Sequence, residues 1–538
     1  MNSVSLERFA LPQALRNQYY SSGYWCGDDL WTSFQNIAAA APRAVAFVEG
    51  DRSIAFDELM VQAESFGRAA AARGLVAGDV LLIHGRQCIE AMVAIMGCAY
   101  GGLVAGLLPH MFSAEQIRGI IDNTSARGIV GLGEPAELGR VLDAATAASL
   151  ETIVVPDGST ITEGTALAWS AFTAVGNGGN EPRAPMSADD LILLTFSSGT
   201  TGAPKGVMHS SNSIRFTVES YARSQAIGTT DTSLVVTAFG FIGSSVLGVY
   251  LSFLCGCRTV LKRDWSADET LDLIERHRVT HFLLMPTHAI DLLNSPKLDH
   301  TDCSSVSRGV VAGVSEAHRL DARKRLCASP FPMYGMSESP GHVTGSMVDD
   351  WERLRRTEGR WLPGTELLVC DDEDRPLPAG EHGNILVRGP NRFLGYYRAD
   401  ELNGASLTGE GYFRTGDVGF VDADGYLTFV GRSKDIIRRG GVTITPADLE
   451  NALRPHPRIA DVAVIGLPDA RLGERACACV ITWDGKDISL AEITEFLQHK
   501  AFARYLWPEH VAVCRSFPRT PSLKVKKNEL LKQVLEQR

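Results

Sequence analysis

The sequence predicts an α/β protein: a strand–helix core, then a short β-rich region, then a compact α+β domain. Three observations lead to this prediction. The 538 residues are too many for one ordinary compact domain. Short apolar runs alternate with amphipathic helical patterns from about Ile54 to Val155, and the same alternation resumes after Leu191. The pattern of apolar and polar residues then changes twice, after Leu367 and after Val430.

In the core, apolar runs that end at turn residues predict strands, and longer periodic segments predict helices. The segment FDELMVQAESFGRAAAARG (56–74) predicts an amphipathic helix that ends at glycine. Strands are predicted for the runs VLLIHG, LVAGLLP, RGIVGL, LILLTF, TSLVVTAF, RTVLKR, THFLLMP and SRGVVAG. A glycine-rich loop and then a helical stretch are expected after LILLTF. Strands that alternate with helices indicate βαβ units and largely parallel sheets.

The C-terminal part has a different pattern. Between Leu367 and Val430, the runs ELLVCDD, GNILVRG and GYLTFVG are joined by Gly, Asp and Pro turns, which indicates a meander or a small barrel. The polar stretch GRSKDIIRRGG is typical of a junction. After it, the helices PADLENALRPHP and SLAEITEFLQHK flank the strands DVAVIGLP and ACACVITW. This combination predicts a compact α+β domain of about 100 residues.

Composition argues against several classes of protein. A net charge of -11 disfavours binding to nucleic-acid phosphates. The 11 cysteines form no CxxC pair, which disfavours a zinc site and fits a reducing compartment. The N-terminus MNSVSLERFA lacks the features of a signal peptide, so a cytoplasmic location is expected. Two uncharged stretches, 91–112 and 233–257, are long enough to span a bilayer, but Gly, Ser and Pro interrupt them. We expect both to be buried core, and no membrane span.

The most informative segment is TFSSGTTGAPKG (195–206), which follows a predicted strand. Glycines let backbone N–H groups approach an oxyanion, hydroxyls donate further hydrogen bonds, and Lys205 adds a positive charge. The segment is not a Walker A loop, because Gly206 rather than Ser or Thr follows Lys205. The segment is therefore a candidate polyphosphate-binding loop. The alternative is a flexible surface turn.

At this point the sequence resembles the adenylate-forming superfamily of acyl-CoA synthetases, adenylation domains and luciferases. SSGTTGAPKG resembles its phosphate signature, with Ser197 in place of the usual Thr. Further matches follow in the family's order: YGMSE (334–338), YFRTGD (412–417), GRSKD (431–435) with Gly440-Gly441, GLPDARLGE (466–474) and PRTPSLKV (518–525). Several motifs in the same order make a chance match improbable.

The resemblance implies two stacked α/β subdomains and a small β-barrel in a large N-terminal domain (1–431). It further implies a hinge (432–437) and a small, mobile α+β C-terminal domain (438–538). It also implies ATP, Mg²⁺ and coenzyme A as cofactors, and a carboxylic acid as the substrate. The acid would first be joined to AMP and then transferred to a thiol.

The resemblance assigns nucleotide-binding roles residue by residue. Phosphate contacts would come from Ser198, Gly199, Thr200, Thr201, Gly202 and Lys205. Tyr334 would stack on adenine, with Gly335 and Met336 beside it and the backbone around Gly313 on the other side. Asp417 and Arg432 would bind the ribose hydroxyls. Each of these residues taken alone also has an ordinary structural explanation, such as a turn Asp or a core aromatic.

The remaining implied roles concern catalysis and the second step. Glu338 would bind Mg²⁺, because a carboxylate suits a hard cation. Ser337 would bond the α-phosphate in place of the family's Thr, and Lys524 would bridge the α-phosphate and the acid. Lys434 would be the hinge residue. Gly440 and Gly441 would border the pantetheine path of CoA.

Two departures from the family pattern affect the prediction. The final motif reads Pro-Ser-Leu523-Lys524 where the family has Gly before the Lys, and Leu adopts a positive φ only under strain. Two alternatives therefore stay open. Either adenylation is slow and the chain thioesterifies acyl-adenylate supplied by a partner enzyme, or Leu523 is tolerated with a small shift of the loop. In the segment 239–243, Gly240 stands where relatives place His or Asp. An α-amino acid substrate is therefore disfavoured, because a buried ammonium needs a carboxylate partner.

The small residues of this segment predict a roomy, mainly apolar pocket for a bulky acid, lined by Phe239, Gly240, Phe241, Gly243 and Val314. Three functions compete: a CoA ligase, a stand-alone enzyme that loads a carrier protein, and a non-catalytic nucleotide-binding protein. The family's charged residues are all present, which disfavours the third function. A homodimer and an adenylating partner enzyme stay open as partners.

Overall fold

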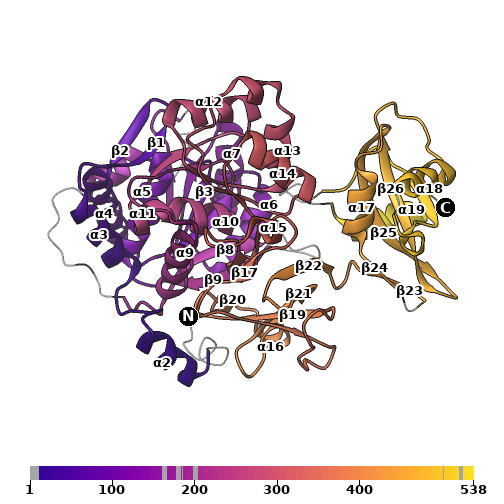
Figure 1. Cartoon of the computed structure of the whole chain (residues 1–538). Coiled ribbons are helices and arrows are strands. Elements are labelled where there is room, and N and C mark those ends of the chain that lie inside the picture. The colour runs from indigo at the N-terminus through magenta and orange to yellow at the C-terminus, as the bar shows by residue number, and fades with distance from the viewer. Residues whose placement is uncertain are drawn as a thin grey trace. The chain divides into compact units, whose positions relative to one another are not determined.

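The computed structural model describes residues 11–159, 166–176, 183, 186–197, 204–440, 442–500, 502–519 and 525–537. Its contacts divide the chain into two compact units. The first unit is Met1–Leu367 with Val387–Phe413, and the second is Leu368–Leu386 with Arg414–Arg538. The colours of Figure 1 follow the chain from indigo in the first unit to yellow at the end of the second. The predicted domain boundaries and the hinge at 432–437 stay predictions.

One eight-stranded sheet of the first unit is parallel except at one edge. Its strands, in order across the sheet, are β20 (Gly395–Tyr396), β9 (Lys205–Ser210), β8 (Leu191–Ser197), β4 (Val104–Pro109), β3 (Val80–Gly85), β5 (Gly128–Leu132), β6 (Thr152–Val155) and β7 (Ala166–Ala168). Strands β8 to β7 run parallel, and β9 and β20 are antiparallel additions. The alternation of apolar runs and helical patterns had predicted this parallel arrangement.

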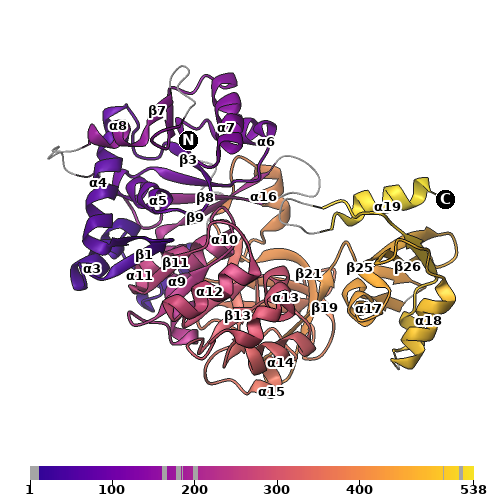
Figure 2. The same cartoon turned by 90° about the horizontal axis from the view of Figure 1, so that it is seen from above.

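Helices cover both faces of this sheet. The chain passes from β3 through α5 (Ile89–Gly101) to β4 and then returns past β3 to β5 through α6 (Ala114–Thr124), so right-handed crossovers place α5 and α6 on opposite faces. The predicted amphipathic helix is α4 (Phe56–Ala72), which packs along α5, while α7 (Pro135–Ala147) packs beside α6 (Figure 2). The short helix α8 (Trp169–Ala174) follows β7.

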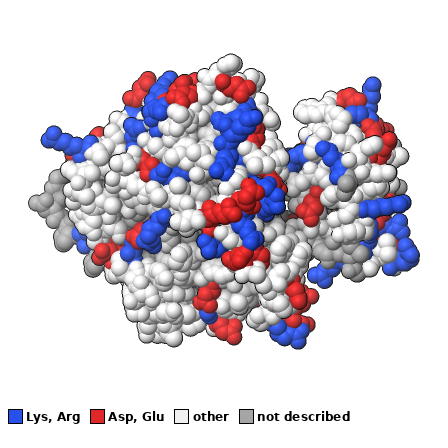
Figure 3. Space-filling model, in the orientation of Figure 1, with Lys and Arg blue, Asp and Glu red and all other residues white. Residues whose placement is uncertain are grey.

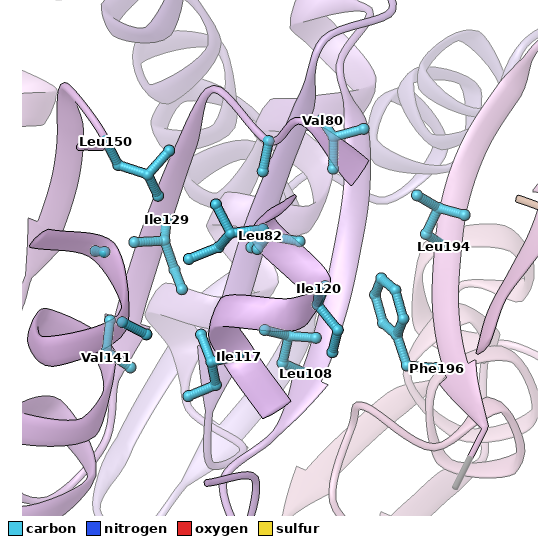
Figure 4. Packing of buried hydrophobic residues seen from close by; sticks show 14 of the residues in the cluster. Val80, Leu82, Leu108, Ile117, Ile120, Ile129, Val141, Leu150, Leu194 and Phe196 are labelled. Carbon is cyan, nitrogen blue, oxygen red and sulfur yellow. The ribbon is translucent and has the colours of Figure 1, made fainter. Parts of the chain in front are cut away.

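The core between the strands and α6 and α7 is apolar. Leu82, Leu108 and Ile129 project from the strands toward Ile117 of α6 and Val141 of α7 (Figure 4). Leu82, Ile117, Ile129 and Val141 have no exposed surface. Burial of an aliphatic side chain stabilises the fold by about 1.5–3 kcal/mol. This core therefore fixes the positions at which β3, β4 and β5 end.

The second, seven-stranded sheet of the first unit is parallel apart from its last strand. Its strands, in order, are β14 (Pro330–Phe331), β13 (Gly309–Val311), β12 (His281–Leu284), β10 (Thr232–Val235), β11 (Arg258–Leu261), β1 (Val45–Glu49) and β2 (Arg52–Ala55). The larger helices around it are α3 (Leu30–Ala40), α9 (Ser211–Gln225), α11 (Tyr250–Cys255), α12 (Ala267–His277), α13 (Pro286–Asn294) and α14 (Glu316–Arg325).

The remaining elements of this unit are short. They are α2 (Gln13–Ser21), α10 (Ile242–Ser244), a π-helix (Ser245–Val249), a 3₁₀ helix (Pro296–His300), α15 (Trp351–Leu354) and α16 (Asp400–Ser406). A three-stranded sheet joins β15 (Met333–Met336), β16 (Ser339–Thr344) and β17 (Arg360–Trp361).

The prediction for the chain after the strand LILLTF (191–196) was incomplete. A helical stretch was expected after the glycine-rich loop, but strand β9 comes first, and it pairs antiparallel with β8 before α9 begins. The run KGVMHS is too short for a helix and was not recognised as a strand. As a result, Lys205 lies at the start of a strand and pairs with Ser197.

The second unit contains most of a four-stranded sheet and the α+β domain. The four-stranded sheet is ordered β18 (Glu366–Cys370), β19 (Gly383–Arg388), β21 (Phe413–Val421) and β22 (Leu427–Arg432). The α+β domain has the sheet order β24 (Val442–Ile444), β23 (Ile437–Arg439), β26 (Gly473–Thr482) and β25 (Ile459–Asp469), with β27 (His510–Val513) beside β26. Helices α17 (Pro446–Leu453), α18 (Leu490–His499), α19 (Lys527–Glu536) and a 3₁₀ turn (Arg504–Leu506) complete it.

The faces of this smaller sheet follow from strand periodicity. Successive side chains of a strand point to opposite faces. Cys477 and Cys479 therefore share one face of β26, as expected, and pack with Leu530 of α19. Ala476 and Ala478 face the other side, where they share a core with residues of α17 and α18.

The two long uncharged stretches are core elements. The first contains α5 and β4, and the second contains β10, α10, the π-helix and α11. Within the described ranges, none of the helices has both the length and the apolar character needed to cross a membrane. The visible face in Figure 3 mixes basic and acidic side chains instead of gathering the basic ones into one patch.

Four buried histidines make stability depend on pH. His84, His209, His281 and His342 are at most 1 % exposed, and burial lowers the pKa of each, to about 4 for three of them and about 3 for His281. The unfolded chain therefore binds more protons than the folded chain between about pH 4 and 6.5, so stability is lost as the pH falls through that window.

We expect the denaturant midpoint to fall between pH 7 and pH 5, with each histidine contributing roughly 1–2 kcal/mol of lost stability. Urea titrations at pH 7, 6 and 5 measure this change. A midpoint that does not change over this range would contradict the prediction.

Candidate active site

The carboxyl ends of parallel strands share one edge of a sheet, and ligands of such sheets bind there. At this edge of the seven-stranded sheet, β10 leads to Phe239, β13 leads to Gly313 and Val314, and β14 leads to the hairpin that carries Tyr334. Tyr334 is 7 % exposed, while Gly313 is exposed at a positive φ of 61°. Three separate segments of the predicted site thus reach the same edge.

The motif YGMSE forms a tight hairpin. Met336 pairs with Ser339, which leaves Ser337 and Glu338 as the two residues of the turn between β15 and β16. His209 of β9 holds this turn: its Nε2 lies 2.8 Å from the carbonyl oxygen of Ser337. The backbone N–H of Phe393 donates to the carbonyl of Glu338 at 2.9 Å. The main chain at the predicted metal-binding residue is therefore anchored on both sides.

The imidazole of His209 is neutral in this position. Burial lowers its pKa to about 4, and a carbonyl can only accept a hydrogen bond, so Nε2 carries the proton. Its Nδ1 lies 3.3 Å from the hydroxyl of Ser213. His209 thus links β9, which starts at Lys205, to the turn that carries Glu338.

Lys205 and Glu338 meet around one aromatic side chain. The hydroxyl of Tyr396 donates to Oε1 of Glu338 at 2.6 Å, and Nζ of Lys205 lies 5.7 Å from the centroid of the Tyr396 ring. A lysine at this distance interacts favourably with the face of a tyrosine ring. The predicted phosphate cation and the predicted metal ligand therefore belong to one cluster.

The side chains of this cluster fit magnesium that arrives on a nucleotide. In the part of the chain that the structure describes, no three His, Cys, Asp or Glu side chains form a metal site. Mg²⁺ typically keeps several waters and is held by one or two carboxylates together with substrate phosphates. The half-buried carboxylate of Glu338 suits that arrangement, so the metal is treated as part of the substrate MgATP.

The second unit pairs Asp417 with Arg432. The two residues lie opposite each other on β21 and β22, and Nε of Arg432 is 2.9 Å from Oδ1 of Asp417. Asp417 is 2 % exposed, whereas the Arg432 side chain is 45 % exposed. The TGD segment had suggested a turn, but it lies inside strand β21, where Gly416 supplies a positive φ of 70°.

Other predicted residues of this unit lie near its turns. Lys434 is exposed in the turn after β22, where the N–H groups of Asp435 and Ile436 bond the carbonyl of Arg432. Gly440, with a φ of 54°, donates its N–H to Leu472 at 2.8 Å. Leu472 belongs to the hairpin between β25 and β26. The segments Gly440 and GLPDARLGE, both predicted from motifs, are therefore in contact.

The segment after β10 connects the two sheets of the first unit. Gln87, which follows β3, donates to the carbonyl of Thr237, which follows β10. Gly240 packs on Pro109 at the end of β4 so closely that no Cβ would fit there. The glycine is required by this backbone contact.

A small cavity lies next to this segment. It has a volume of about 10 Å³, close to the minimum for one water molecule. It is lined mainly by apolar residues, among them Val235, Leu247 and Leu283, and also by Gly243. Phe239 is fully buried and Val314 is 9 % exposed. The predicted roomy pocket and the size of the acid stay predictions.

Several predicted residues lie outside the described ranges: Ser198, Gly199, Thr200, Thr201, Gly202, Gly441 and Lys524, together with Leu523. The described residues Arg519 and Val525, on either side of the final motif, pair in antiparallel orientation.

Sequence reasoning missed Tyr396 and His209. Tyr396 is one of two adjacent tyrosines in GYY (395–397), and nothing in that pattern says which ring faces Glu338. His209 follows the phosphate segment in KGVMHS. Its closeness to Lys205 in sequence is the only local sign that it belongs to the site. A histidine buried in the core for structural reasons would show the same sequence pattern.

The predicted nucleotide-binding segments of the first unit thus gather at the carboxyl edge of its parallel strands. Residues 34–397 match the model of the AMP-binding enzyme family, and residues 448–524 match that of the AMP-binding enzyme C-terminal domain. The chain belongs to this family of ATP-dependent ligases, within the adenylate-forming superfamily and its acyl-CoA ligase branch.

Two curated relatives and one solved structure illustrate the likeness. The medium-chain fatty-acid–CoA ligase of Escherichia coli is 30 % identical over 97 % of this chain and 93 % of its own length. A salicyl-AMP ligase/salicyl-S-ArCP synthetase of Mycobacterium tuberculosis is 30 % identical over 96 % of this chain and 92 % of its own. An anthranilate CoA ligase in complex with anthranoyl-AMP superposes with a TM-score of 0.84 at 23 % identity, over 94 % of this chain and 97 % of that one.

The packing of Gly240 gives a direct prediction. In Gly240→Ala the new Cβ meets the backbone of Leu108 and Pro109, which cannot yield as a flexible side chain would. We expect a loss of about 1–3 kcal/mol in the free energy of unfolding.

The matched control is Gly243→Ala, since the nearest atom to a Cβ at Gly243 is 3.9 Å away. Gly243 lies in α10, where Ala is favoured over Gly, so this variant should be neutral or slightly more stable. Urea midpoints of the two variants measure the difference. Equal midpoints would show that Gly240 does not hold the sheets together.

Proposed function

We propose that this ligase joins a bulky, mainly apolar, non-amino carboxylic acid to coenzyme A through an enzyme-bound acyl-adenylate. The observation that carries the proposal is the cluster around Tyr396. It brings the cation of Lys205 and the carboxylate of Glu338 to one place. A cation and a metal-binding carboxylate are the groups that neutralise the phosphates of MgATP.

The proposed nucleotide contacts follow the motifs. The β- and γ-phosphates would be held by Ser198, Gly199, Thr200, Thr201, Gly202 and Lys205, and Mg²⁺ by Glu338. Tyr334, Gly335 and Met336 would line one side of the adenine and Gly313 the other. Asp417 would accept hydrogen bonds from the ribose hydroxyls, which a carboxylate with two oxygens can do, and Arg432 would donate.

The proposed reaction has two steps. A carboxylate oxygen of the acid attacks the α-phosphorus, and pyrophosphate leaves. Ser337 and Lys524 would bond the α-phosphate and the acid, which stabilises charge in the transition state. The thiol of CoA then attacks the acyl carbon, and AMP leaves. For this step the chain would turn at Lys434 and present Gly440 and Gly441 to the pantetheine arm.

The acid class rests on the segment after β10. Gly240 offers no carboxylate to an ammonium group, and the neighbouring cavity is lined by Val235, Leu247 and Leu283. An acid without an α-amino group and with an apolar body matches this lining.

A carrier protein is the second candidate acceptor. The salicyl-AMP ligase relative carries the name of an ArCP synthetase, and it matches this chain over 96 % of its length. Both acceptors end in a pantetheine thiol, so the same residues would serve either one.

Product analysis tests the proposal. The protein is incubated with ATP, Mg²⁺, CoA and a panel of acids from acetate to polycyclic acids, and the products are identified by mass spectrometry. We expect AMP, pyrophosphate and an acyl-CoA, with large apolar acids preferred. Acyl-adenylate that reacts with a carrier protein but not with CoA would favour the second candidate. Preference for acetate would contradict the acid class.

Lys524 should separate the two half-reactions. In Lys524→Ala the bridging charge is lost, so we expect acid-dependent ATP–pyrophosphate exchange to fall about 10²–10³-fold. Conversion of supplied acyl-adenylate and CoA to acyl-CoA should stay within about threefold, because that step does not use this lysine.

Leu523→Gly is the companion variant. Faster exchange than in the natural chain would indicate that Leu523 restrains adenylation and that an outside source of acyl-adenylate matters. An unchanged exchange rate would indicate that the loop tolerates Leu523. Equal loss of both half-reactions in Lys524→Ala would contradict the assigned role.

A further inference from the structure

Tyr396 occupies a fixed place at the edge of the eight-stranded sheet. It lies in the two-residue strand β20 and pairs with Val207 of β9, two residues after Lys205. Its backbone N–H donates to the side chain of Asn403 at 2.7 Å, and its carbonyl accepts from the same side chain at 2.9 Å. Asn403 is 3 % exposed. The amide of one buried side chain thus locks the backbone of Tyr396.

The ring of Tyr396 is held as firmly as its backbone. It is 7 % exposed and packs edge-on against Phe393, with ring centroids 5.0 Å apart at 73°. Edge-to-face contacts of this kind restrict the ring. The hydroxyl therefore has little freedom, and it is directed at Oε1 of Glu338.

The hydrogen bond from the Tyr396 hydroxyl to the Glu338 carboxylate is charge-assisted. A hydroxyl that donates to a carboxylate at 2.6 Å is in the short, strong range of such bonds. Because the Ser337 and Glu338 carbonyls are already held by His209 and Phe393, the side chain of Glu338 is the part that would otherwise rotate. Tyr396 supplies the missing restraint.

The ring of Tyr396 also contacts Lys205. Its Nζ sits over the ring face, and among the residues that the structure describes no ion pair within 4.0 Å joins Lys205 to Glu338. Opposite charges at about 4 Å near a protein surface attract by several kcal/mol. A direct Lys205–Glu338 pair would neutralise the two groups that the phosphates and Mg²⁺ require.

We propose that Tyr396 is a positioning residue for MgATP: its hydroxyl orients the Glu338 carboxylate toward the metal, and its ring keeps Lys205 and Glu338 apart. This inference rests on the proposed function, in which Glu338 binds the metal of MgATP. Hydrogen-bond partners of metal-binding carboxylates commonly change metal affinity 10–100-fold when removed.

Tyr396→Phe tests the hydroxyl. Two quantities are measured: the affinity of the protein for ATP by calorimetry, with Mg²⁺ and with EDTA, and the Mg²⁺ concentration that gives half-maximal rate at saturating ATP. We expect about tenfold weaker binding of MgATP, less than twofold change for ATP in EDTA, and a higher Mg²⁺ requirement. The KM for the acid should not change, because Tyr396 is not among the residues proposed to line the acid pocket.

The matched control is Tyr397→Phe. Tyr397 is the next residue, is 5 % exposed, and donates its hydroxyl to the carbonyl of Thr124 at 3.2 Å, away from Glu338. It loses the same atom from a similarly buried ring, so any general effect on stability appears in both variants. Tyr396→Leu removes the ring as well. In that variant binding of metal-free ATP should also weaken, because Lys205 can then pair with Glu338.

Glu338→Gln separates the inference from the function on which it rests. If Glu338→Gln weakens MgATP binding but Tyr396→Phe behaves like Tyr397→Phe, the inference is overturned and the proposed function stands. If Glu338→Gln leaves the Mg²⁺ requirement unchanged, the assigned role of Glu338 fails and the inference fails with it. Tighter MgATP binding in Tyr396→Phe would also overturn the inference.

Discussion

The close contact between Gly240 and Pro109 sets the geometry on which the first unit depends. The two α/β sheets each end their parallel strands at one edge, and this contact fixes one edge against the other. Only glycine allows the backbones to come so near. The hydrogen bond from Gln87 to Thr237 joins the same two edges. The segments that follow the two sets of parallel strands are therefore held at one place in the first unit.

Within that frame, the charged groups are held apart by neutral partners. His209 and Phe393 fix the main chain of the hairpin turn, and Tyr396 fixes the carboxylate of Glu338. His209 does so without adding charge, because burial lowers its pKa far below neutrality. The cation of Lys205 and the carboxylate of Glu338 are thus held in place around Tyr396. Preorganised charge of this kind is the main source of catalysis in phosphoryl transfer.

Asp417 and Arg432 are arranged differently. Asp417 is nearly fully buried and Arg432 is half exposed, so the pair presents a fixed acceptor with a more mobile donor beside it. Cross-strand register, rather than a turn, aligns the two residues. The contrast with the Tyr396 cluster is physical: Tyr396 contacts both Lys205 and Glu338, whereas Asp417 and Arg432 contact each other directly.

The sequence alone determined the class of fold, most strands and helices, and the order of the motifs, because apolar periodicity and glycine turns are local properties. It also named Lys205, Glu338, Asp417 and Arg432, because their neighbours in sequence form recognisable patterns. The tertiary structure alone decided that KGVMHS is a strand, that Asp417 lies inside a strand, and that Gly240 packs against Pro109. It also decided that Tyr396, and not Tyr397, faces Glu338. Each of these features depends on strand pairing or packing between residues far apart in the chain. A local sequence pattern does not specify which distant residue will be the partner.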